Sequence, residues 1–264
     1  MRESVNRYIS DWRIQENILL NDNFFLLKLI SGRLLPEILP GQFAQIRVKD
    51  TENVFLRRPI SIHYIDKKNN ELWLLIQIVG KGTSRLSEMQ PNGHLNLIYP
   101  LGNGFTIPSN LIKSKEVLLI GGGVGIAPLL YLGSYLKERG FKLTFLLGAK
   151  TENGLPQLSE FRKVGMVYIT TENGELGEKG VVTDHSLLSR AYADFIYSCG
   201  PKPMMMAVAR YAKQHDIFCE VSLENHMACG IGVCLCCIEK TQKGNTCVCQ
   251  EGPVFNINQL KWQI

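Results

Sequence analysis

The sequence predicts a multidomain protein of the β plus α/β class: a β-barrel first, a parallel α/β domain second and a small cysteine-rich domain last. Three observations predict this order. Short apolar segments separated by turn residues fill the first hundred positions, strand and helix patterns alternate after Gly104, and all eight cysteines lie in the last quarter. The chain has 264 residues, and domains of about 100–200 residues are usual. The expected domains are residues 1–105, 106–218 and 219–264.

The first domain is expected to consist of short strands. Aliphatic and aromatic residues form the segments, and turn sequences such as Pro40-Gly41 and Asn69-Asn70 separate them. The expected strands are residues 23–30, 42–48, 72–79 and 94–99. Many short strands with turn signals favour a small barrel or sandwich.

The second domain is expected to alternate strands with helices. The expected strands are residues 116–120, 143–147, 167–170 and 195–198, and the expected helices are residues 128–139, 187–191 and 203–215. Residues 117–136 carry no charge and match a membrane span in length. Because this window contains Gly121–Gly125 (GGGVG) and Pro128, it favours a buried strand, a turn and a helix instead.

Charge and the start of the chain exclude several classes of function. Lys and Arg number 29 and Asp and Glu 24, a formal net charge of +5. The longest basic clusters are the pairs Arg57-Arg58 and Lys67-Lys68, too sparse for a nucleic-acid or membrane surface. The first ten residues lack the apolar core of a signal peptide. We therefore expect a cytoplasmic protein with neither nucleic acid nor membrane as partner.

The cysteines are concentrated at one place, which argues for a metal or cluster in a reducing compartment. Six of the eight lie within residues 229–249. Cys229, Cys234 and Cys237 have the C-x4-C-x2-C spacing that opens the plant-type [2Fe–2S] ligand pattern. The fourth thiolate must come from Cys236, Cys247 or Cys249. The alternative is a zinc knuckle of Cys234, Cys237, Cys247 and Cys249, which would leave Cys229 and the glycines of this loop unexplained.

Two glycine-containing turns follow strands of the second domain. Gly121, Gly122, Gly123 and Gly125 would let the backbone approach a pyrophosphate at a helix start, although the spacing is not G-x-G-x-x-G. Cys199, Gly200 and Pro201 follow another strand, at the edge where parallel sheets bind ligands. The alternatives are a plain strand–helix turn for the first segment and a buried small hydrophobe for Cys199.

Two motifs of the first domain could hold an anion. Arg58, Pro59, Ile60 and Ser61 combine a guanidinium fork with a hydroxyl, although the segment also reads as an ordinary strand start. Residues 80–83 (GKGT) are either a turn or a loop that donates N–H groups to an anion.

In this order, the motifs resemble the ferredoxin–NADP reductase superfamily and, within it, the electron-transfer subunits of dihydroorotate dehydrogenase B. The resemblance covers nearly the whole chain. Its most specific elements are residues 227–237 and the closing residues 249–255 (CQEGPVF). Ile60 stands where the superfamily usually has an aromatic residue, which suits this subfamily.

The resemblance implies three cofactors: FAD in the β-barrel, NAD(H) in the α/β domain and a [2Fe–2S] cluster in the last domain. The implied FAD residues are Arg58, Pro59, Ile60, Ser61, Leu75, Ile76, Gln77, Gly82 and Thr83. Those flanking NAD(H) are Gly121, Gly122, Gly123, Gly125, Cys199, Gly200 and Pro201. The implied cluster ligands are Cys229, Cys234, Cys237 and, from the family's Cys-x-x-Gly-Pro ending, Cys249.

The implied function is electron transfer between NAD(H) and an FMN-containing dihydroorotate dehydrogenase catalytic subunit, within a heterotetramer. No acid–base pair or nucleophile for a small substrate is visible, so we expect no dihydroorotate oxidation by this chain alone. Residues 148–152 (GAKTE) offer no Arg for a 2′-phosphate, which favours NAD(H) over NADP(H). The alternatives are an NAD(P)H:ferredoxin-type oxidoreductase subunit, whose related small subunits have Asp where Cys229 stands, and a zinc-binding redox sensor.

Overall fold

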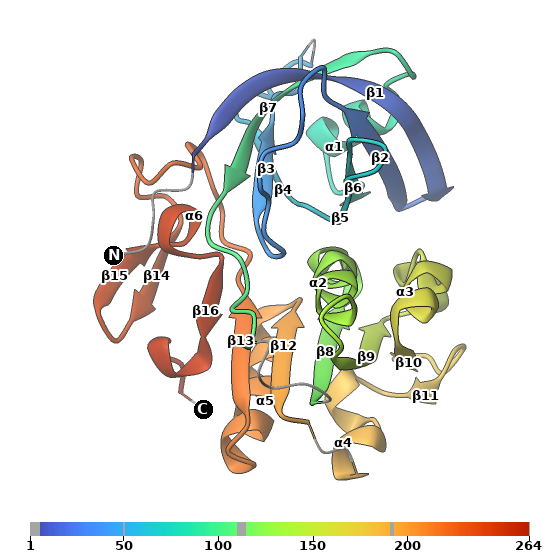
Figure 1. Cartoon of the computed structure of the whole chain (residues 1–264), viewed down its shortest axis with the longest axis vertical. Coiled ribbons are helices and arrows are strands. Elements are labelled where there is room, and N and C mark those ends of the chain that lie inside the picture. The colour runs from blue at the N-terminus through green and yellow to red at the C-terminus, as the bar shows by residue number, and fades with distance from the viewer. Residues whose placement is uncertain (1–5, 50, 110–114, 191–192, 264) are drawn as a thin grey trace.

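Two large sheets and a small hairpin make up the fold (Figure 1). The computed structural model describes residues 6–49, 51–109, 115–190 and 193–263. In these ranges the first two sheets have seven strands each and the third has two. The first sheet curls above the second, and the cysteine-rich segment lies beside both (Figure 1).

The first sheet is antiparallel, in the order β4-β3-β7-β1-β2-β6-β5. Its elements are β1 (Tyr8–Asn21), β2 (Phe24–Ile30), β3 (Phe43–Ile46), β4 (Arg58–Ser61), β5 (Tyr64–Asp66), β6 (Glu71–Gln77), the helix α1 (Lys81–Ser87) and β7 (His94–Leu101). The four expected strands are confirmed as β2, β3, β6 and β7. Strands β1 and β5 were not expected. Strand β5 has only three residues, and only Trp12 and Ile14 of the 14 residues of β1 are buried, which leaves a weak apolar pattern.

The expectation of a turn or loop at residues 80–83 is corrected, because α1 begins at Lys81 and includes Gly82 and Thr83. The Thr83 hydroxyl accepts hydrogen bonds from the backbone N–H groups of Val79 (2.9 Å) and Gly80 (3.2 Å). A local side-chain bond of this kind organises a short helix that has no apolar periodicity to reveal it.

The second sheet has the order β11-β10-β9-β8-β12-β13-β16, and only β16 runs antiparallel to its neighbour. Its strands are β8 (Glu116–Gly122), β9 (Lys142–Ala149), β10 (Met166–Thr171), β11 (Glu178–Lys179), β12 (Phe195–Cys199), β13 (Phe218–Ser222) and β16 (Val254–Asn256). Its helices are α2 (Ala127–Lys137), α3 (Leu158–Val164), α4 (Leu187–Arg190) and α5 (Lys202–Gln214). The alternation of strands and helices is thus as expected, except that α3, β11, β13 and β16 were missed and residue 191 lies outside the described residues.

The uncharged window of residues 117–136 forms β8, a 3₁₀ turn at Gly123–Ile126 and α2, as expected. Within the described ranges, no helix combines the length and the apolar character needed to cross a membrane.

The cysteine-rich segment is tied into the second sheet. It contributes the hairpin β14 (Ile238–Thr241) and β15 (Gly244–Cys247), the helical turn α6 (Val248–Glu251), and the sheet strand β16. Strand β13 runs across the expected boundary at residue 218, and the domain limits remain a proposal. Cys237, Val248 and Cys249 share one hydrophobic core with β8, α5 and the first-sheet residue Phe43.

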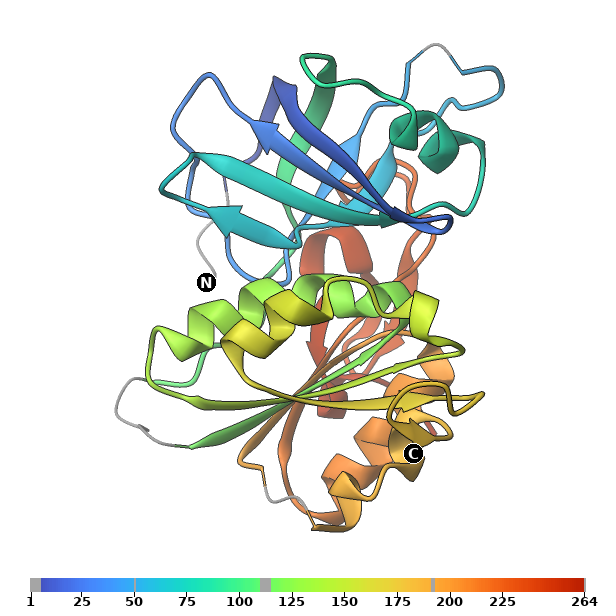
Figure 2. The ribbon, with the colours of Figure 1, turned by 90° about the vertical axis from the view of Figure 1, so that its right-hand side faces the viewer.

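Helices α2 and α3 lie between the two sheets (Figure 2). The Tyr131 hydroxyl of α2 donates a hydrogen bond to the Ile38 carbonyl oxygen at 2.8 Å. His63, which follows β4, places Nδ1 2.7 Å from the Ala127 carbonyl oxygen at the start of α2. A single hydrophobic core joins residues of β2 and β6 to α2 and β8. The first sheet therefore packs directly on the start of α2, next to the glycine-containing turn Gly123–Ile126.

Burial of His63 makes this contact sensitive to acid. Burial lowers the pKa of the His63 imidazole to about 4, although the bond to Ala127 and a contact from Gln157 act in the opposite direction. As pH falls from 6.5 to 4, the unfolded chain takes up the proton first, so stability present at neutral pH is lost. This shift corresponds to roughly 3 kcal/mol.

We therefore expect His63→Phe to flatten the fall in unfolding free energy between pH 6.5 and 4, measured by urea denaturation. His94→Gln, at an exposed histidine of β7, should retain the wild-type slope. Parallel slopes for wild type and His63→Phe would show that His63 is not the acid-sensitive group.

Candidate functional site

A central cavity of about 650 Å³ lies where the two sheets and the cysteine-rich segment meet. Eight of the nine residues expected to bind FAD line it, and Gly82 is the exception: Arg58, Pro59, Ile60, Ser61, Leu75, Ile76, Gln77 and Thr83. Val124 and Ala127 line it from the turn after β8 and the start of α2, and residues 222–227, Cys236 and Pro253 line it as well. Motifs far apart in the sequence therefore border one cavity.

Arg58 and Gly82 are in contact at this cavity. A methyl group at Gly82 would lie 2.7 Å from Arg58 Nε, so the absence of a side chain there lets the guanidinium lie against α1. The Arg58 Nη1 group donates to the Leu56 carbonyl oxygen at 2.9 Å, which fixes the side chain over the cavity rim. A guanidinium so placed can bind a phosphate.

The side chain of the neighbouring Arg57 instead binds the protein backbone. Its Nη1 group donates to the carbonyl oxygens of Gln45 (3.2 Å) and Asn96 (2.9 Å), which joins β3 to β7. Burial, and secondly the charge of Arg47, lower the pKa of Arg57 from its usual value. The adjacent arginines thus differ in role, as the sequence alone could not show.

The seven residues expected to flank NAD(H) lie together at the carboxyl edge of β8 and β12. A methyl group at Gly125 would lie 2.5 Å from the Cys199 carbonyl oxygen, and one at Gly122 would lie 2.5 Å from Met204 Sδ. These two glycines therefore allow the two strand–helix turns to touch. Gly123 differs, because its φ is +55° and its Cβ position faces open space.

The Cys199 thiol does not face this edge. Its side chain is buried in the core between the sheets, and burial raises the pKa of the thiol well above its usual value. This position matches the reading of Cys199 as a small buried hydrophobe. The central cavity is lined by Val124 and Ala127 rather than by the glycines or Cys199.

The four expected cluster ligands form two pairs. The Cys229 thiol contacts the Cys234 thiol, and the Cys237 thiol contacts the Cys249 thiol. All eight cysteines are free thiols. A [2Fe–2S] cluster needs two thiolates on each iron, so two adjacent pairs fit its ligand requirement.

Backbone N–H groups converge on these sulfur atoms. Cys229 Sγ accepts from Ile231, Val233 and Cys234, each at 3.4 Å. Burial acts to raise the pKa of the Cys229 thiol, but these donors outweigh it and lower that pKa to about 6. The loop of residues 229–237, hereafter the cysteine loop, therefore stabilises the thiolate of Cys229, which is the metal-binding form.

Backbone donors also reach the second pair. Gly232 donates to Cys249 Sγ at 3.1 Å, and the Cys249 backbone donates to Cys237 Sγ at 3.3 Å. The two remaining candidates for the fourth ligand make different contacts. Cys236 is exposed and lines the central cavity, while the Cys247 thiol donates to the Gly232 carbonyl oxygen at 3.9 Å.

The zinc-knuckle alternative would leave out Cys229, whose thiol contacts the Cys234 thiol. Among the residues that the structure describes, no three His, Cys, Asp or Glu side chains are placed around a single ion site.

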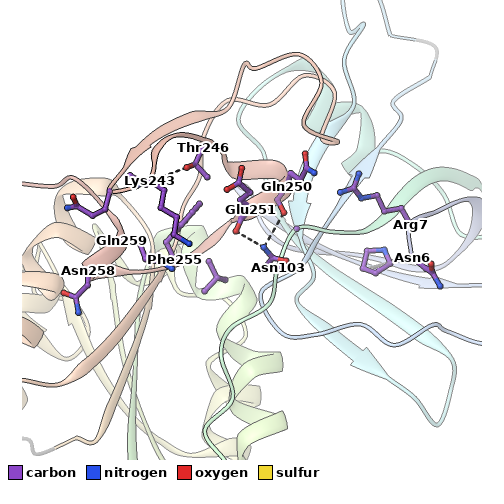
Figure 3. A pocket seen from close by; sticks show the side chains of 15 residues that line it. Asn6, Arg7, Asn103, Lys243, Thr246, Gln250, Glu251, Phe255, Asn258 and Gln259 are labelled. Carbon is purple, nitrogen blue, oxygen red and sulfur yellow. Dashed lines mark hydrogen bonds between the residues drawn. The ribbon is translucent and has the colours of Figure 1, made fainter. Parts of the chain in front are cut away.

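A second cavity, of about 890 Å³, lies between the start of the chain and the cysteine-rich segment (Figure 3). None of the expected site residues borders it. At its edge, Asn103 Nδ2 donates to the Glu251 carbonyl oxygen at 2.7 Å and the Asn103 backbone donates to the Gly252 carbonyl oxygen at 2.6 Å. Asn103 thus holds the turn that carries Cys249 against the end of β7, a role without a signal in the sequence.

Comparison with known proteins identifies relatives over nearly the whole chain. The family model for the iron–sulfur cluster binding domain of dihydroorotate dehydrogenase B matches residues 224–261. A protein of Fusobacterium nucleatum named dihydroorotate dehydrogenase B (NAD(+)), electron transfer subunit, is 37% identical, with 94% of this chain and 96% of that protein covered. A protein of the same name from Lysinibacillus sphaericus is 38% identical, with 97% of each chain covered.

Solved structures show the same architecture. The NADH-dependent reduced ferredoxin–NADP oxidoreductase structure matches with a TM-score of 0.83 and 29% identity, covering 95% of this chain and 90% of the other. The ferredoxin–NADP+ reductase of Plasmodium falciparum matches with a TM-score of 0.65 and 19% identity, covering 81% and 95%. These matches confirm the fold class and the resemblance that the sequence predicted.

The contact between the two glycine-containing turns gives a test of the geometry of this edge. In Gly125→Ala the new methyl group would meet backbone atoms of Cys199 and Gly200 at 2.5 Å, so the turns must separate. We expect the free energy of unfolding to fall by roughly 1–3 kcal/mol, the range typical of overpacking. The measurement is urea denaturation.

Gly32→Ala is the matched control, because a methyl group there meets nothing within 4 Å. Its effect should stay within about 0.5 kcal/mol. Equal stability of the two variants would contradict the close approach of the turns.

Proposed function

The chain belongs to the family of dihydroorotate dehydrogenase B electron-transfer subunits, and from this we propose how its own residues carry electrons between NAD(H) and a catalytic partner subunit. The chain is an oxidoreductase subunit of pyrimidine biosynthesis whose cofactors are FAD, a [2Fe–2S] cluster and NAD(H). One observation carries the proposal: a single cavity is lined by the expected FAD residues, the start of α2 and the edge of the cysteine loop.

We propose that the central cavity binds FAD. Arg58, fixed against Gly82 and the Leu56 carbonyl oxygen, would neutralise the pyrophosphate. Backbone groups at the end of β6, residues 75–77, would face the flavin ring system, because these residues line the cavity while the Leu75 and Ile76 side chains are buried. When bound, FAD exchanges two electrons with a nicotinamide and single electrons with an iron–sulfur cluster.

NAD(H) is proposed to bind at the carboxyl edge of β8 and β12. Gly123 offers an open backbone position there, and Val124 and Ala127, next along the chain, line the FAD cavity. A nucleotide over this turn would therefore have its nicotinamide close to the flavin position. Lys150 and Glu152, after β9, supply no guanidinium for a 2′-phosphate, which supports NAD(H) as the nucleotide.

The proposed cluster ligands are Cys229 and Cys234 on one iron and Cys237 and Cys249 on the other. The pairing of the thiols and the convergent N–H donors support this assignment. Cys236, two residues from Cys234 and exposed toward the cavity, would lie between flavin and cluster without being a ligand.

The catalytic partner subunit is proposed to dock on the outer side of the cysteine loop. Three apolar side chains of this loop are exposed: Ile231 by 38%, Val233 by 75% and Leu235 by 62%. Exposed apolar residues around a redox centre would let a partner exclude water and approach closely. We propose an FMN-containing partner, a heterotetramer and a cytoplasmic location.

The fourth ligand is tested by two cysteine variants. Cys249→Ser should lose most of the iron and acid-labile sulfide, because a serine oxygen is a poor ligand in a thiolate set. Cys236→Ser should retain wild-type iron, sulfide and visible absorbance. Full iron content in Cys249→Ser, or loss of iron in Cys236→Ser, would show that Cys249 is not the fourth ligand.

The proposed function is tested with the chain alone and with its partner. The chain alone should reduce an artificial dye with NADH and should not oxidise dihydroorotate, because it offers no acid–base pair for that substrate. Addition of the catalytic subunit should couple dihydroorotate oxidation to NAD+ reduction. Dihydroorotate turnover by the chain alone, or efficient ferredoxin reduction without the partner, would contradict the proposal.

The docking surface is tested in the same assay. Val233→Glu should weaken co-purification with the catalytic subunit by at least about tenfold, since it buries a charge in an apolar contact. Leu34→Glu is the matched control, because Leu34 is 90% exposed on the loop after β2, near Asn70 rather than the cysteine loop. Dye reduction should be unchanged in both variants.

A further inference from the structure

Gln45, in the middle of β3, has a buried side chain without hydrogen bonds to the described residues. Its exposed fraction is 0%, and both Nε2 and Oε1 lack a partner. Leaving a buried amide unpaired costs about 1–3 kcal/mol for each group, so native proteins rarely retain one. A partner absent from the protein chain itself is therefore indicated.

The position of Gln45 on β3 directs its side chain away from the barrel core. Ala44 and Ile46 point into that core, whereas Phe43 packs with Cys237 and Cys249 on the opposite face. Because side chains alternate along a strand, Gln45 lies on the same face as Phe43. This is the face that the cysteine-rich segment covers.

Gln45 contacts the cysteine loop next to its first cysteine. A methyl group at Gly230 would lie 2.6 Å from Gln45 Nε2 and 2.8 Å from its Cγ atom. Gly230 also has a φ of +70°, which a residue with a side chain adopts at a cost. The amide of Gln45 is thus held against the residue that follows Cys229.

A second buried glutamine on the same segment shows the contrast. Gln42 is 1% exposed, but its Nε2 donates to the Gly102 carbonyl oxygen at 2.9 Å and its Oε1 accepts from the Leu39 backbone at 2.7 Å. Both polar atoms of the Gln42 side chain are therefore bonded to the protein backbone. Gln45, beside the proposed cluster position, has no such partner among the described residues.

We propose that the Gln45 side-chain amide donates a hydrogen bond to a sulfur atom of the [2Fe–2S] cluster and thereby sets its reduction potential. The inference rests on the proposed function, which puts the cluster at Cys229, Cys234, Cys237 and Cys249. Reduction adds one electron to the cluster, and an N–H donor to sulfur favours the more negative form. No covalent bond changes and no proton leaves the amide.

The same residue connects the two redox sites. Strand β3 carries Phe43, which lines the FAD cavity, and Gln45, which contacts the cysteine loop. The Gln45 carbonyl oxygen is held by Arg57, so the strand cannot move independently of β7. The FAD-binding sheet thus supplies a direct contact to the cluster.

The test uses Gln45→Met, which retains the side-chain length and removes the donor, in the full chain with its cofactors. Iron and sulfide content is measured first, and the cluster potential is then determined by an EPR-monitored redox titration. We expect wild-type iron content and a ratio of reduced to oxidised cluster about tenfold lower at a fixed potential near the midpoint, as expected for one lost hydrogen bond to a charged group. Tenfold corresponds to about 59 mV for one electron.

Gln42→Met is the matched control. It removes two hydrogen bonds to protein backbone, so it should lower the unfolding free energy and leave the cluster potential unchanged. As a direct readout, pulsed EPR of the reduced cluster in protein labelled with ¹⁵N at glutamine side chains should show a nitrogen coupling that Gln45→Met removes.

The outcomes distinguish failure of the inference about Gln45 from failure of the proposed function. An unchanged potential and an unchanged nitrogen coupling in Gln45→Met, with the cluster present, would overturn the inference about Gln45 alone. Wild-type protein reconstituted with iron and sulfide that still holds no cluster would overturn both the inference and the proposed function.

Discussion

The packing of the cysteine loop against the first sheet is the contact on which the rest of the structure depends. The loop could not hold two thiol pairs by itself, because its backbone has little regular structure and three of its side chains point to solvent. It is fixed from outside: Gly230 lies on Gln45, and Asn103 holds the turn that carries Cys249. Strand β16 then joins this segment to the second sheet. These contacts fix the position of the cysteine-rich segment relative to both sheets. The three parts of the chain therefore meet at one cavity.

Close backbone approach is the second constraint. Gly82 allows Arg58 to lie on α1, Gly122 and Gly125 allow two strand–helix turns to touch, and Gly230 allows Gln45 to reach the cysteine loop. At each of these positions a methyl group would meet another atom at 2.5–2.7 Å. These glycines act mainly by permitting contact between chain segments, and in the turn after β8 only Gly123 faces open space. A glycine-rich sequence near a nucleotide site thus combines residues with different physical roles.

Most of the fold could be predicted from the sequence, because local patterns carry it. Strands β2, β6 and β8 are apolar runs bounded by turn residues, helix α5 is amphipathic, and the C-x4-C-x2-C spacing is readable without structure. Strand β1 could not be predicted from apolar pattern because its pairing partners bury only two of its side chains. Gln45 and Asn103 gave no signal, because their importance arises from contacts with residues more than 140 positions away. Such long-range contacts are not encoded in any local pattern.

The central claim is that electrons from NADH reach a cluster in the cysteine-rich segment through a flavin in the central cavity. The most direct test is anaerobic addition of NADH to the purified chain, with the flavin followed by absorbance and the cluster by low-temperature EPR. The account predicts bleaching of the flavin together with the EPR signal of a reduced [2Fe–2S] cluster. Reduction of the flavin while a chemically reducible cluster stays oxidised, or the absence of flavin from protein supplied with FAD, would contradict it.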